Sequence, residues 1–318
     1  MSTKNPILVN HVLSSNVESS IFNAIFDYHR RFAPQGAQIR VSAESLPDAT
    51  LYHYHRPHLE PCLSQPAVVT VHHDLTDPDP WLALSRFLPR YREAKLVVCL
   101  NRTQQALLAR HGINHTVVIS HGYNGDVLRP KTTKPRDQRS DGKITFGFLS
   151  RYYDRRVKGE AYLSDLVKAL DAERIAFILV GRRRNVTAEQ LSRLGYEVRC
   201  YQHLPYALFQ DLYEAIDYLL VTSNFEGGPA SLPEAMATHT PIISTRVGFA
   251  PDFLDDGQTG LLLTGVVDED APRILRLTDP SDPLTRALDE GAPTLAATCP
   301  TWREVVQSHF EAYLDLLR

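Results

Sequence analysis

The stretch Asn224-Phe-Glu-Gly-Gly-Pro-Ala-Ser-Leu-Pro-Glu-Ala-Met-Ala237 places two carboxylates, Glu226 and Glu234, on either side of two glycines, a proline and a serine. It follows the apolar run Tyr218–Thr222, which predicts a buried strand, and its second half predicts the start of a helix. Glycines let a backbone approach a ligand closely, and a helix N-terminus presents unpaired N–H groups to an anion. The order of strand, glycine-rich loop and helix therefore predicts a ligand-binding loop.

A purely structural interpretation fits the same residues. Ser231-Leu-Pro-Glu234 matches a capping box, with serine at the N-cap, proline in the first turn and glutamate at the third helical position. Local sequence does not decide between helix capping and ligand binding, and both roles can coexist.

The surrounding pattern alternates short apolar runs with amphipathic segments. Strands are predicted at 7–12, 67–71, 96–100, 117–120, 144–149, 175–180, 218–222 and 241–244, and helices at 18–31, 80–94, 103–110, 160–170, 188–194, 207–216, 232–237 and 302–317. Such alternation is typical of parallel, doubly wound sheets, whose strand C-terminal ends bind ligands. We expect an α/β fold with two Rossmann-like domains facing a cleft.

The length of 318 residues suits two cores. Residues 129–143 contain two prolines, one glycine and no large apolar side chain, which predicts an interdomain linker. We therefore expect an N-terminal domain over residues 1–128, a linker over 129–143 and a second domain over 144–300. Residues 301–318 are expected to form a C-terminal helix, which can cross back to the first domain.

Charge and cysteine content limit the partners and the cellular location that we expect for the protein. The net charge of residues 1–128, 129–200 and 201–318 is +1, +8 and −12, so a basic middle can attract an anion, but the acidic last third argues against nucleic acid. Four well-separated cysteines predict neither a disulfide framework nor a zinc site. No signal peptide or membrane span is evident. We expect a cytoplasmic protein, with the inner face of the membrane as an alternative location through peripheral contact.

The spacing of Glu226 and Glu234, an E-x7-E, resembles the donor-site signature of the GT4 family of retaining glycosyltransferases, which have the GT-B fold. Residues 241–263 resemble the segment that follows this signature in the family. Residues 118–130 resemble the segment that precedes the family's linker. The resemblance covers most of residues 67–263 and is specific in combination. It implies that residues 1–128 form the acceptor-side domain and that residues 144–300 form the nucleotide-sugar-binding domain, both Rossmann-like.

The resemblance implies roles for the loop residues. Glu234 would hold the ribose hydroxyls of a nucleotide sugar, since a carboxylate accepts two hydrogen bonds, and Glu226 would lie at the sugar. The backbone around Gly227, Gly228, Pro229, Ala230 and Ser231 would hold sugar hydroxyls and phosphate.

Phe146–Gly159 resembles the family's arginine and lysine-glycine clamp on the diphosphate, with Arg151 and Lys158 as the expected cations. Two fixed cations would stabilise negative charge on the leaving phosphate. Arg155 or Arg156 could take the place of Arg151, and a solvated basic loop is the structural alternative. Gly181 and Arg182 end a strand where the fold places loops near the nucleotide, although an ordinary exposed basic turn explains residues 181–184 better.

Val69-Thr-Val-His-His-Asp74 resembles the N-domain motif whose histidine contacts the donor sugar, and either His72 or His73 fits it. Asp77-Pro-Asp79 mimics a metal-binding motif, but helix capping near Pro80 explains it better. The chain departs from the family after its first strand, where Leu13–Ser20 replaces a Gly-Gly loop and Ser15 to Glu18 fits a capping box.

The resemblance thus implies a retaining, metal-independent hexosyltransferase without a cofactor, which moves a sugar from a nucleoside diphosphate sugar to an acceptor hydroxyl. Uridine or guanosine diphosphate sugars are the expected donors. Glycans or lipid-linked glycans of surface polysaccharide or glycoconjugate assembly are the expected acceptors. The alternatives are a non-catalytic nucleotide-sugar-binding relative and an epimerase or phosphorylase on the same fold.

Overall fold

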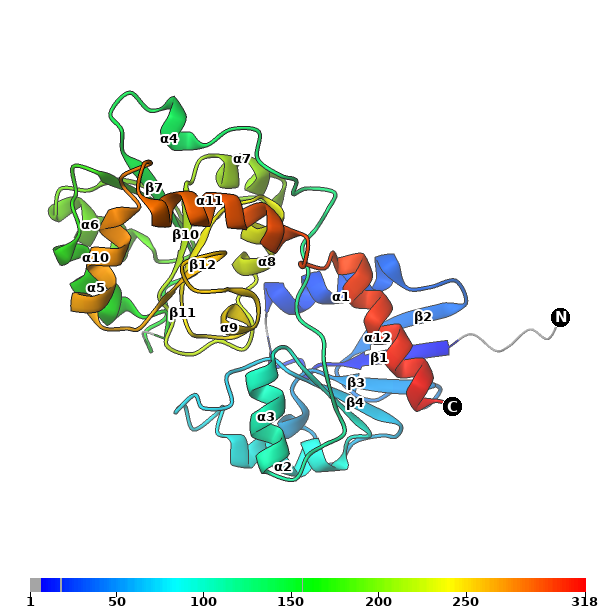
Figure 1. Cartoon of the computed structure of the whole chain (residues 1–318). Coiled ribbons are helices and arrows are strands. Elements are labelled where there is room, and N and C mark those ends of the chain that lie inside the picture. Colours follow the sequence, from blue (N-terminus) through cyan, green and yellow to red (C-terminus); the bar gives the residue numbers. More distant parts are fainter. Residues whose placement is uncertain (1–6, 18, 156) are drawn as a thin grey trace. The chain divides into compact units, whose positions relative to one another are not determined.

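The computed structural model describes residues 7–17, 19–155 and 157–318. Contacts divide the chain into two compact units, one reaching to Gly122 and including Pro300–Arg318, the other covering Tyr123–Cys299. Each unit is an α/β layer structure around one parallel sheet (Figure 1). Both sheets have six strands, which fits the doubly wound architecture that the alternating pattern predicts.

The sheet of the first unit has the order β2-β1-β3-β4-β5-β6. Its strands are β1 (Ile7–Val12), β2 (Ala37–Ser42), β3 (Leu51–Tyr54), β4 (Ala67–Val71), β5 (Leu96–Cys99) and β6 (Thr116–Val118). Its helices are α1 (Ser20–Phe32), α2 (Leu84–Glu93), α3 (Arg102–Arg110) and α12 (Trp302–Leu316), with a 3-10 turn η1 at Pro57–Leu59.

Two separate cores cover the two faces of this sheet. On one face Val9, Leu51 and Val68 pack against apolar residues of α1 and α12, and these two helices contact each other. On the opposite face Val69 and Val71 pack with residues of α2 and α3. Alternate residues of a strand point to opposite faces, so the odd residues of β1 and β3 face α1 and α12.

The sheet of the second unit has the order β12-β11-β10-β7-β8-β9. Its strands are β7 (Ile144–Leu149), β8 (Ile175–Val180), β9 (Glu197–Tyr201), β10 (Tyr218–Val221), β11 (Ile242–Thr245) and β12 (Gly260–Leu263). Its helices are α4 (Pro135–Gln138), α5 (Glu160–Ala169), α6 (Asn185–Arg193), α7 (Phe209–Glu214), α8 (Ser231–Ala237), α9 (Ala250–Phe253), α10 (Val267–Arg276) and α11 (Pro283–Ala296), with a 3-10 turn η2 at Tyr206–Leu208.

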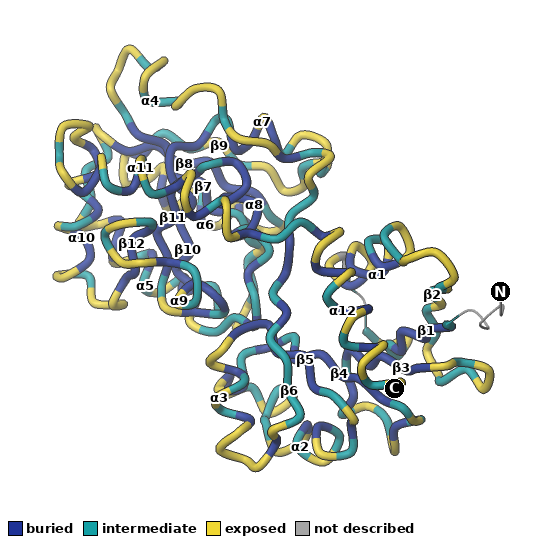
Figure 2. Tube along the Cα trace, turned by 45° about the vertical axis from the view of Figure 1, so that its right-hand side comes forward, coloured by how far each residue is buried: buried dark blue, intermediate teal, exposed yellow. Residues whose placement is uncertain are grey.

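The central strands of this sheet are continuous apolar runs that are buried on both faces (Figure 2). Such strands are typical of parallel sheets covered by helices. The order of strands reverses between β7 and β10, which are neighbours in the sheet but far apart in sequence. The carboxyl ends of these two strands form the switch point at which open α/β sheets bind ligands.

The segment Arg129–Lys143, which composition predicts as an interdomain linker, lies wholly within the second unit. The scarcity of apolar residues in this segment does not indicate an interdomain linker, because polar contacts attach the segment to the second unit. The Arg136 amide donates to Asp217 over 2.9 Å, the Arg136 guanidinium pairs with Asp289, and the Lys131 ammonium donates to the carbonyl of Ile216. The change of unit falls at Gly122 and Tyr123, and residues 301–318 belong to the first unit.

Two further expectations about capping are wrong. Helix α1 begins at Ser20 with Ser19 as its N-cap, one turn after Ser15, and Glu18 lies outside the described residues. Helix α2 begins at Leu84 with Ala83 as its N-cap. Asp77 and Asp79 instead accept bonds from the amides two residues on, at 2.9 and 2.8 Å, which makes them turn-forming residues.

None of the described helices combines the length and the apolar composition needed to cross a lipid bilayer.

Candidate active site

Two segments of the second unit meet at the carboxyl ends of β7 and β10. One is the turn that carries Lys158, and the other is the segment 222–226, which follows β10. The Thr222 hydroxyl donates to the carbonyl of Lys158 over 2.8 Å, and the Asn224 amide donates to the carbonyl of Val157 over 2.9 Å. Gly159 has a φ of 74°, and a Cβ there would lie 1.7 Å from the carbonyl oxygen of Thr222. Only glycine lets the lysine-bearing turn lie this close to the end of β10.

The Lys158 ammonium forms an ion pair with Glu226, and the Ser223 hydroxyl donates to the same carboxylate oxygen over 2.9 Å. The side chains of Lys158 and Glu226 are each 15% exposed, so the pair is largely shielded from water yet reachable. The structure therefore brings together two of the residues that the sequence singles out, which lie 68 positions apart. A half-buried cation beside a carboxylate can bind a phosphate and a sugar hydroxyl at adjacent positions.

Arg151 lies in the loop after β7 and is exposed, with its guanidinium 4.0 Å from the ring centroid of Tyr153. The ring of Tyr153 also lies 5.6 Å from the Lys158 ammonium, so one aromatic side chain contacts both cations. Arg155 is exposed in the same loop, and Arg156 lies outside the described residues. The structure thus places Arg151 on the tyrosine that Lys158 also contacts.

The loop carrying Arg151 is held by a residue that sequence reasoning missed. Arg184 is fully buried, donates to the carbonyl of Ser150 over 2.6 Å and to its hydroxyl over 2.8 Å, and lies 3.2 Å from a carboxylate oxygen of Glu160. The expectation of an exposed basic turn therefore holds for Arg182 and Arg183 but is wrong for Arg184. Three consecutive arginines gave no signal that the third points inward.

Gly181 and Arg182 act here through their backbones. Gly181 has a φ of 149°, and a Cβ at this position would lie 2.4 Å from the carbonyl oxygen of Ser150, so glycine permits the close approach of the loop after β7. The carbonyl of Arg182 accepts from the Tyr152 amide over 2.9 Å, while its own side chain is exposed.

Helix α8 begins at Ser231 with Ala230 as its N-cap, and no side chain caps it. The predicted capping box of Ser231 and Glu234 is therefore wrong. The first-turn amides of a helix have no acceptor within the helix, and here no side chain of the described residues replaces it. The Gly227–Pro229 segment is packed against Gly248, where a Cβ would lie 2.6 Å from Pro229.

Glu234 points into the interior and is 9% exposed. The Tyr213 hydroxyl donates to it over 3.0 Å, and Tyr206 donates to it as well. Burial raises the pKa of Glu234 from 4.5 to about 7, against the two tyrosine hydrogen bonds, which lower it. Tyr213 was not singled out in the sequence, although a tyrosine hydroxyl on the apolar side of a helix requires a buried partner.

The two candidate histidines belong to the first unit and differ in environment. His73 is 5% exposed, and its ring packs on Phe87 with ring centroids 4.2 Å apart, as a core residue does. His72 is partly exposed, and its Nε2 lies 2.9 Å from Nδ1 of His55. Burial lowers the pKa of both histidines, so both rings are neutral at pH 7.

Two sequence comparisons relate the chain to known glycosyl transferases. Residues 143–279 match the family model described as glycosyl transferases group 1. A D-inositol 3-phosphate glycosyltransferase of Corynebacterium jeikeium (strain K411) is 28% identical over 183 residues, which are 54% of this chain and 43% of that protein. The chain thus matches less than half the length of this relative.

Solved structures match the whole chain at low identity. Sucrose-phosphate synthase (tll1590) from Thermosynechococcus elongatus has a TM-score of 0.78 at 16% identity, with 98% of this chain and 99% of that chain covered. Anabaena Alr3699/HepE in complex with UDP-glucose has a TM-score of 0.73 at 17% identity, with 97% and 100% covered. The chain therefore has the GT-B fold, and most of its second unit matches the model of group 1 glycosyl transferases.

Proposed function

We propose that this chain transfers a sugar from a nucleoside diphosphate sugar to an acceptor hydroxyl, with retention at the anomeric carbon. The observation that carries the proposal is the set of Lys158, Glu226 and Ser223 at the switch point of the second sheet, with Glu234 buried in the helix that follows. The family match over residues 143–279 and the sugar-transferring relative support the same activity.

The donor lies with its diphosphate against Lys158 and Arg151. Departure of the nucleotide builds negative charge on the phosphate, and two positioned cations stabilise that charge in the transition state. Because Lys158 already pairs with Glu226, its ammonium is held in one place before the donor binds. Preorganisation of this kind avoids the cost of ordering a flexible lysine during the reaction.

Glu226 has one oxygen engaged by Lys158 and Ser223, so its second oxygen is the one that can accept from a sugar hydroxyl. Glu234 accepts from the ribose hydroxyls, with Tyr213 holding the carboxylate in place. The backbone of Gly227 to Ser231 binds the hydroxyls and the phosphate through the uncapped first turn of α8.

Solved structures of Alr3699/HepE contain UDP and UDP-glucose, which supports a uridine diphosphate sugar as the donor, with a guanosine diphosphate sugar as the alternative. We propose a glycan or lipid-linked glycan of surface polysaccharide assembly as acceptor. Catalysis proceeds without a metal, because the two cations take the place of a metal at the diphosphate.

The test is incubation of the purified chain with a panel of uridine, guanosine, adenosine and thymidine diphosphate sugars and acceptor extracts. The expected result is release of nucleoside diphosphate with a glycosylated product whose anomeric configuration, read by NMR, equals that of the donor. Lys158→Ala should slow this release by roughly 10²–10³, whereas the exposed Lys168→Ala, which loses only a surface ion pair, should leave it unchanged.

Other outcomes assign another function. Binding of a donor with no turnover indicates a non-catalytic relative. Release of free sugar phosphate indicates a phosphorylase, and conversion of the donor sugar without transfer indicates an epimerase. An inverted product contradicts the proposed retention.

A further inference from the structure

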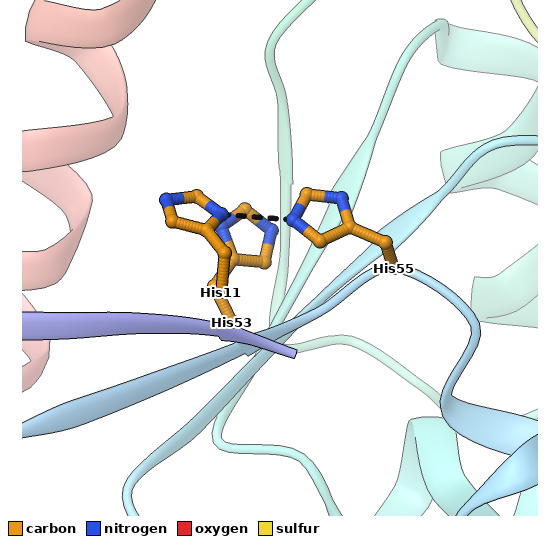
Figure 3. Close-up of side chains that lie close together, drawn as sticks. All are labelled: His11, His53 and His55. Atoms are coloured by element: carbon orange, nitrogen blue, oxygen red, sulfur yellow. Dashed lines mark hydrogen bonds between the residues drawn. The ribbon is translucent and has the colours of Figure 1, made fainter. Parts of the chain in front are cut away.

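The face of the first sheet that packs against α1 and α12 carries a row of polar side chains. On the paired strands β1 and β3, His11 lies opposite His53, and His55 follows two residues further along (Figure 3). On the next strand Thr70 is in β4, and His72 follows two residues on. Since residues two apart share a face, these side chains form one polar row across the sheet.

Three of these rings are linked end to end. Nδ1 of His11 lies 2.8 Å from Nε2 of His55, and Nδ1 of His55 lies 2.9 Å from Nε2 of His72. The ring centroids are 5.1 Å apart in both pairs, with interplanar angles of 22° and 31°. His11 and His55 are buried, whereas His72 is partly exposed. The rings form a hydrogen-bonded chain that leads from the core to the candidate donor contact.

A neutral imidazole carries a proton on one nitrogen, so each ring in such a chain donates at one end and accepts at the other. Burial lowers the pKa of all three rings well below 6.5, and the neighbouring His29, His53, His73, His121, His309 and Arg56 lower one or another of them further. The rings are therefore neutral at pH 7, and only two proton arrangements are possible. The position of the proton on one ring fixes it on the other two.

The two arrangements differ at the ends of the chain. In one, Nδ1 of His72 carries a proton and Nε2 of His11 carries none; in the other, the reverse holds. Nε2 of His11 is buried and has no hydrogen-bond partner among the residues that the structure describes. A buried N–H without an acceptor is rarer in proteins than an acceptor without a donor. The first arrangement is therefore favoured.

We propose that His55, backed by His11, is a positioning residue that holds His72 as the tautomer with its proton on Nδ1, and that this N–H is left to donate to an oxygen of a ligand. That this ligand is a substrate of sugar transfer rests on the proposed function. Nδ1 of His72 makes no hydrogen bond to the described residues, so it is the nitrogen left for a ligand.

A metal site is the rival interpretation of the same rings, because ligand atoms of His11, His53 and His55 all lie within 4.8 Å of one another. Zinc–nitrogen bonds of about 2.0–2.1 Å place two ligand nitrogens about 3.3 Å apart in a tetrahedral site. The 2.8 Å between His11 and His55 is shorter, and it is a normal hydrogen-bond distance. The nitrogens of His53 are engaged by Tyr313 and Thr70, both at 2.6 Å. The geometry thus favours hydrogen bonds over coordination.

The tautomer of His72 can be read directly from the ¹⁵N chemical shifts of its two ring nitrogens in the full-length chain at pH 7.5. We expect the pattern of a neutral ring protonated at Nδ1. Because this measurement needs neither donor nor turnover, it tests the chain of imidazoles even if the proposed function fails. A neutral ring protonated at Nε2 overturns the proposal.

Variants then test positioning. His55→Phe keeps an aromatic ring but removes both hydrogen bonds, so His72 should show a mixture of tautomers and kcat/KM should fall roughly tenfold, as for the loss of one net hydrogen bond. His55→Gln, which retains a donor and an acceptor, should restore part of that loss. His309→Phe is the matched control, because His309 is equally buried but bonds only to the carbonyl of Val305 in its own helix.

If His55→Phe does not fold, His55→Gln and the wild-type spectrum still decide the question. Equal His72 shifts and equal kcat/KM in wild type, His55→Phe and His309→Phe would overturn the positioning role. So would stoichiometric zinc in the purified protein, or zinc-induced loss of the His11 and His55 hydrogen-bonded signals, because these rings would then be ligands. If His72 is protonated at Nδ1 but the chain binds no nucleotide sugar, only the proposed function is refuted.

Discussion

Replacement of Glu234 by glutamine should make the chain more stable at high pH and weaken nucleotide binding at the same time. Glu234 is 9% exposed, and burial raises its pKa from 4.5 to about 7. The folded state therefore holds this proton more tightly than the unfolded state. Below pH 4.5 the group is neutral in both states, and as the pH rises to 7 and above the folded state must bury a carboxylate, which costs stability.

The size of the effect follows from the pKa. A rise of 2.5 in pKa corresponds to about 3 kcal/mol at 1.36 kcal/mol for each unit, as an upper value. Glutamine has nearly the same shape and still accepts from Tyr213, but it cannot ionise. The free energy of unfolding of Glu234→Gln, relative to the wild type, should therefore increase by up to about 3 kcal/mol between pH 4.5 and pH 8.

Urea unfolding of both proteins at several pH values, followed by far-UV circular dichroism, measures this difference. Dichroism is needed because both tryptophans, Trp81 and Trp302, lie in the first unit, whereas Glu234 lies in the second. If the free energies of unfolding of the two proteins change in parallel across this pH range, the raised pKa of Glu234 is contradicted.

Ionisation of Glu234 lowers the stability of the folded chain, but it should raise the affinity for nucleotide. Ribose hydroxyls donate to a carboxylate, so the affinity for nucleoside diphosphate should rise with pH up to about 7 and then level off in the wild type. In Glu234→Gln the affinity should fall by about 1–3 kcal/mol at pH 8 and lose this pH dependence. Glu226→Gln, at the sugar end, should spare nucleotide affinity and lower kcat. Unchanged nucleotide affinity in Glu234→Gln would remove this residue from the site.

The remaining predictions concern the cations and the backbone around them. Lys158→Ala or Arg151→Ala should each lower kcat/KM by roughly 10²–10³, measured by steady-state kinetics, and wild-type kinetics in Arg151→Ala would show that another arginine acts. Gly159→Ala should lower the melting temperature strongly, because its Cβ would lie 1.7 Å from the carbonyl oxygen of Thr222, and an unchanged melting temperature would refute the close approach. Ser231→Ala should leave the melting temperature unchanged, since Ser231 caps no helix, and a loss of stability would restore the capping interpretation. Activity should survive magnesium removal by chelation, and its recovery only on adding magnesium or manganese would contradict metal-independent transfer.

Periodicity predicted most of the elements that are apolar throughout or clearly amphipathic, but it missed strand β12 and helices α10 and α11. Strands β7 and β8 lie at the predicted residues, because both are buried runs in which Thr145 is the single polar residue. Strand β2 was not predicted, since it lies at the sheet edge and alternates with exposed glutamine and arginine. The linker prediction failed because ion pairs, not apolar side chains, attach residues 129–143 to the second unit.

The site was predictable only where one local motif contains it. Glu226 and Glu234 belong to one continuous motif, the loop before α8 and its first turn, and the resemblance pointed to both. Arg184 and Tyr213 could not be found in this way, because each acts on a segment distant in sequence, Ser150 and Glu234 respectively. The linked histidines were also hidden, since their contacts depend on the strand order β1-β3-β4, which periodicity does not give.

The proposed function requires the second unit to bind a nucleoside diphosphate sugar at the ends of β7 and β10. Calorimetric titration of the wild type and of Lys158→Ala with uridine, guanosine, adenosine and thymidine diphosphates and their sugars measures this binding. We expect one-to-one, saturable binding for one base, weakened in Lys158→Ala because the diphosphate loses a cation held beside Glu226. Absence of saturable binding for every nucleotide, or equal affinity in the two proteins, would contradict the proposed function.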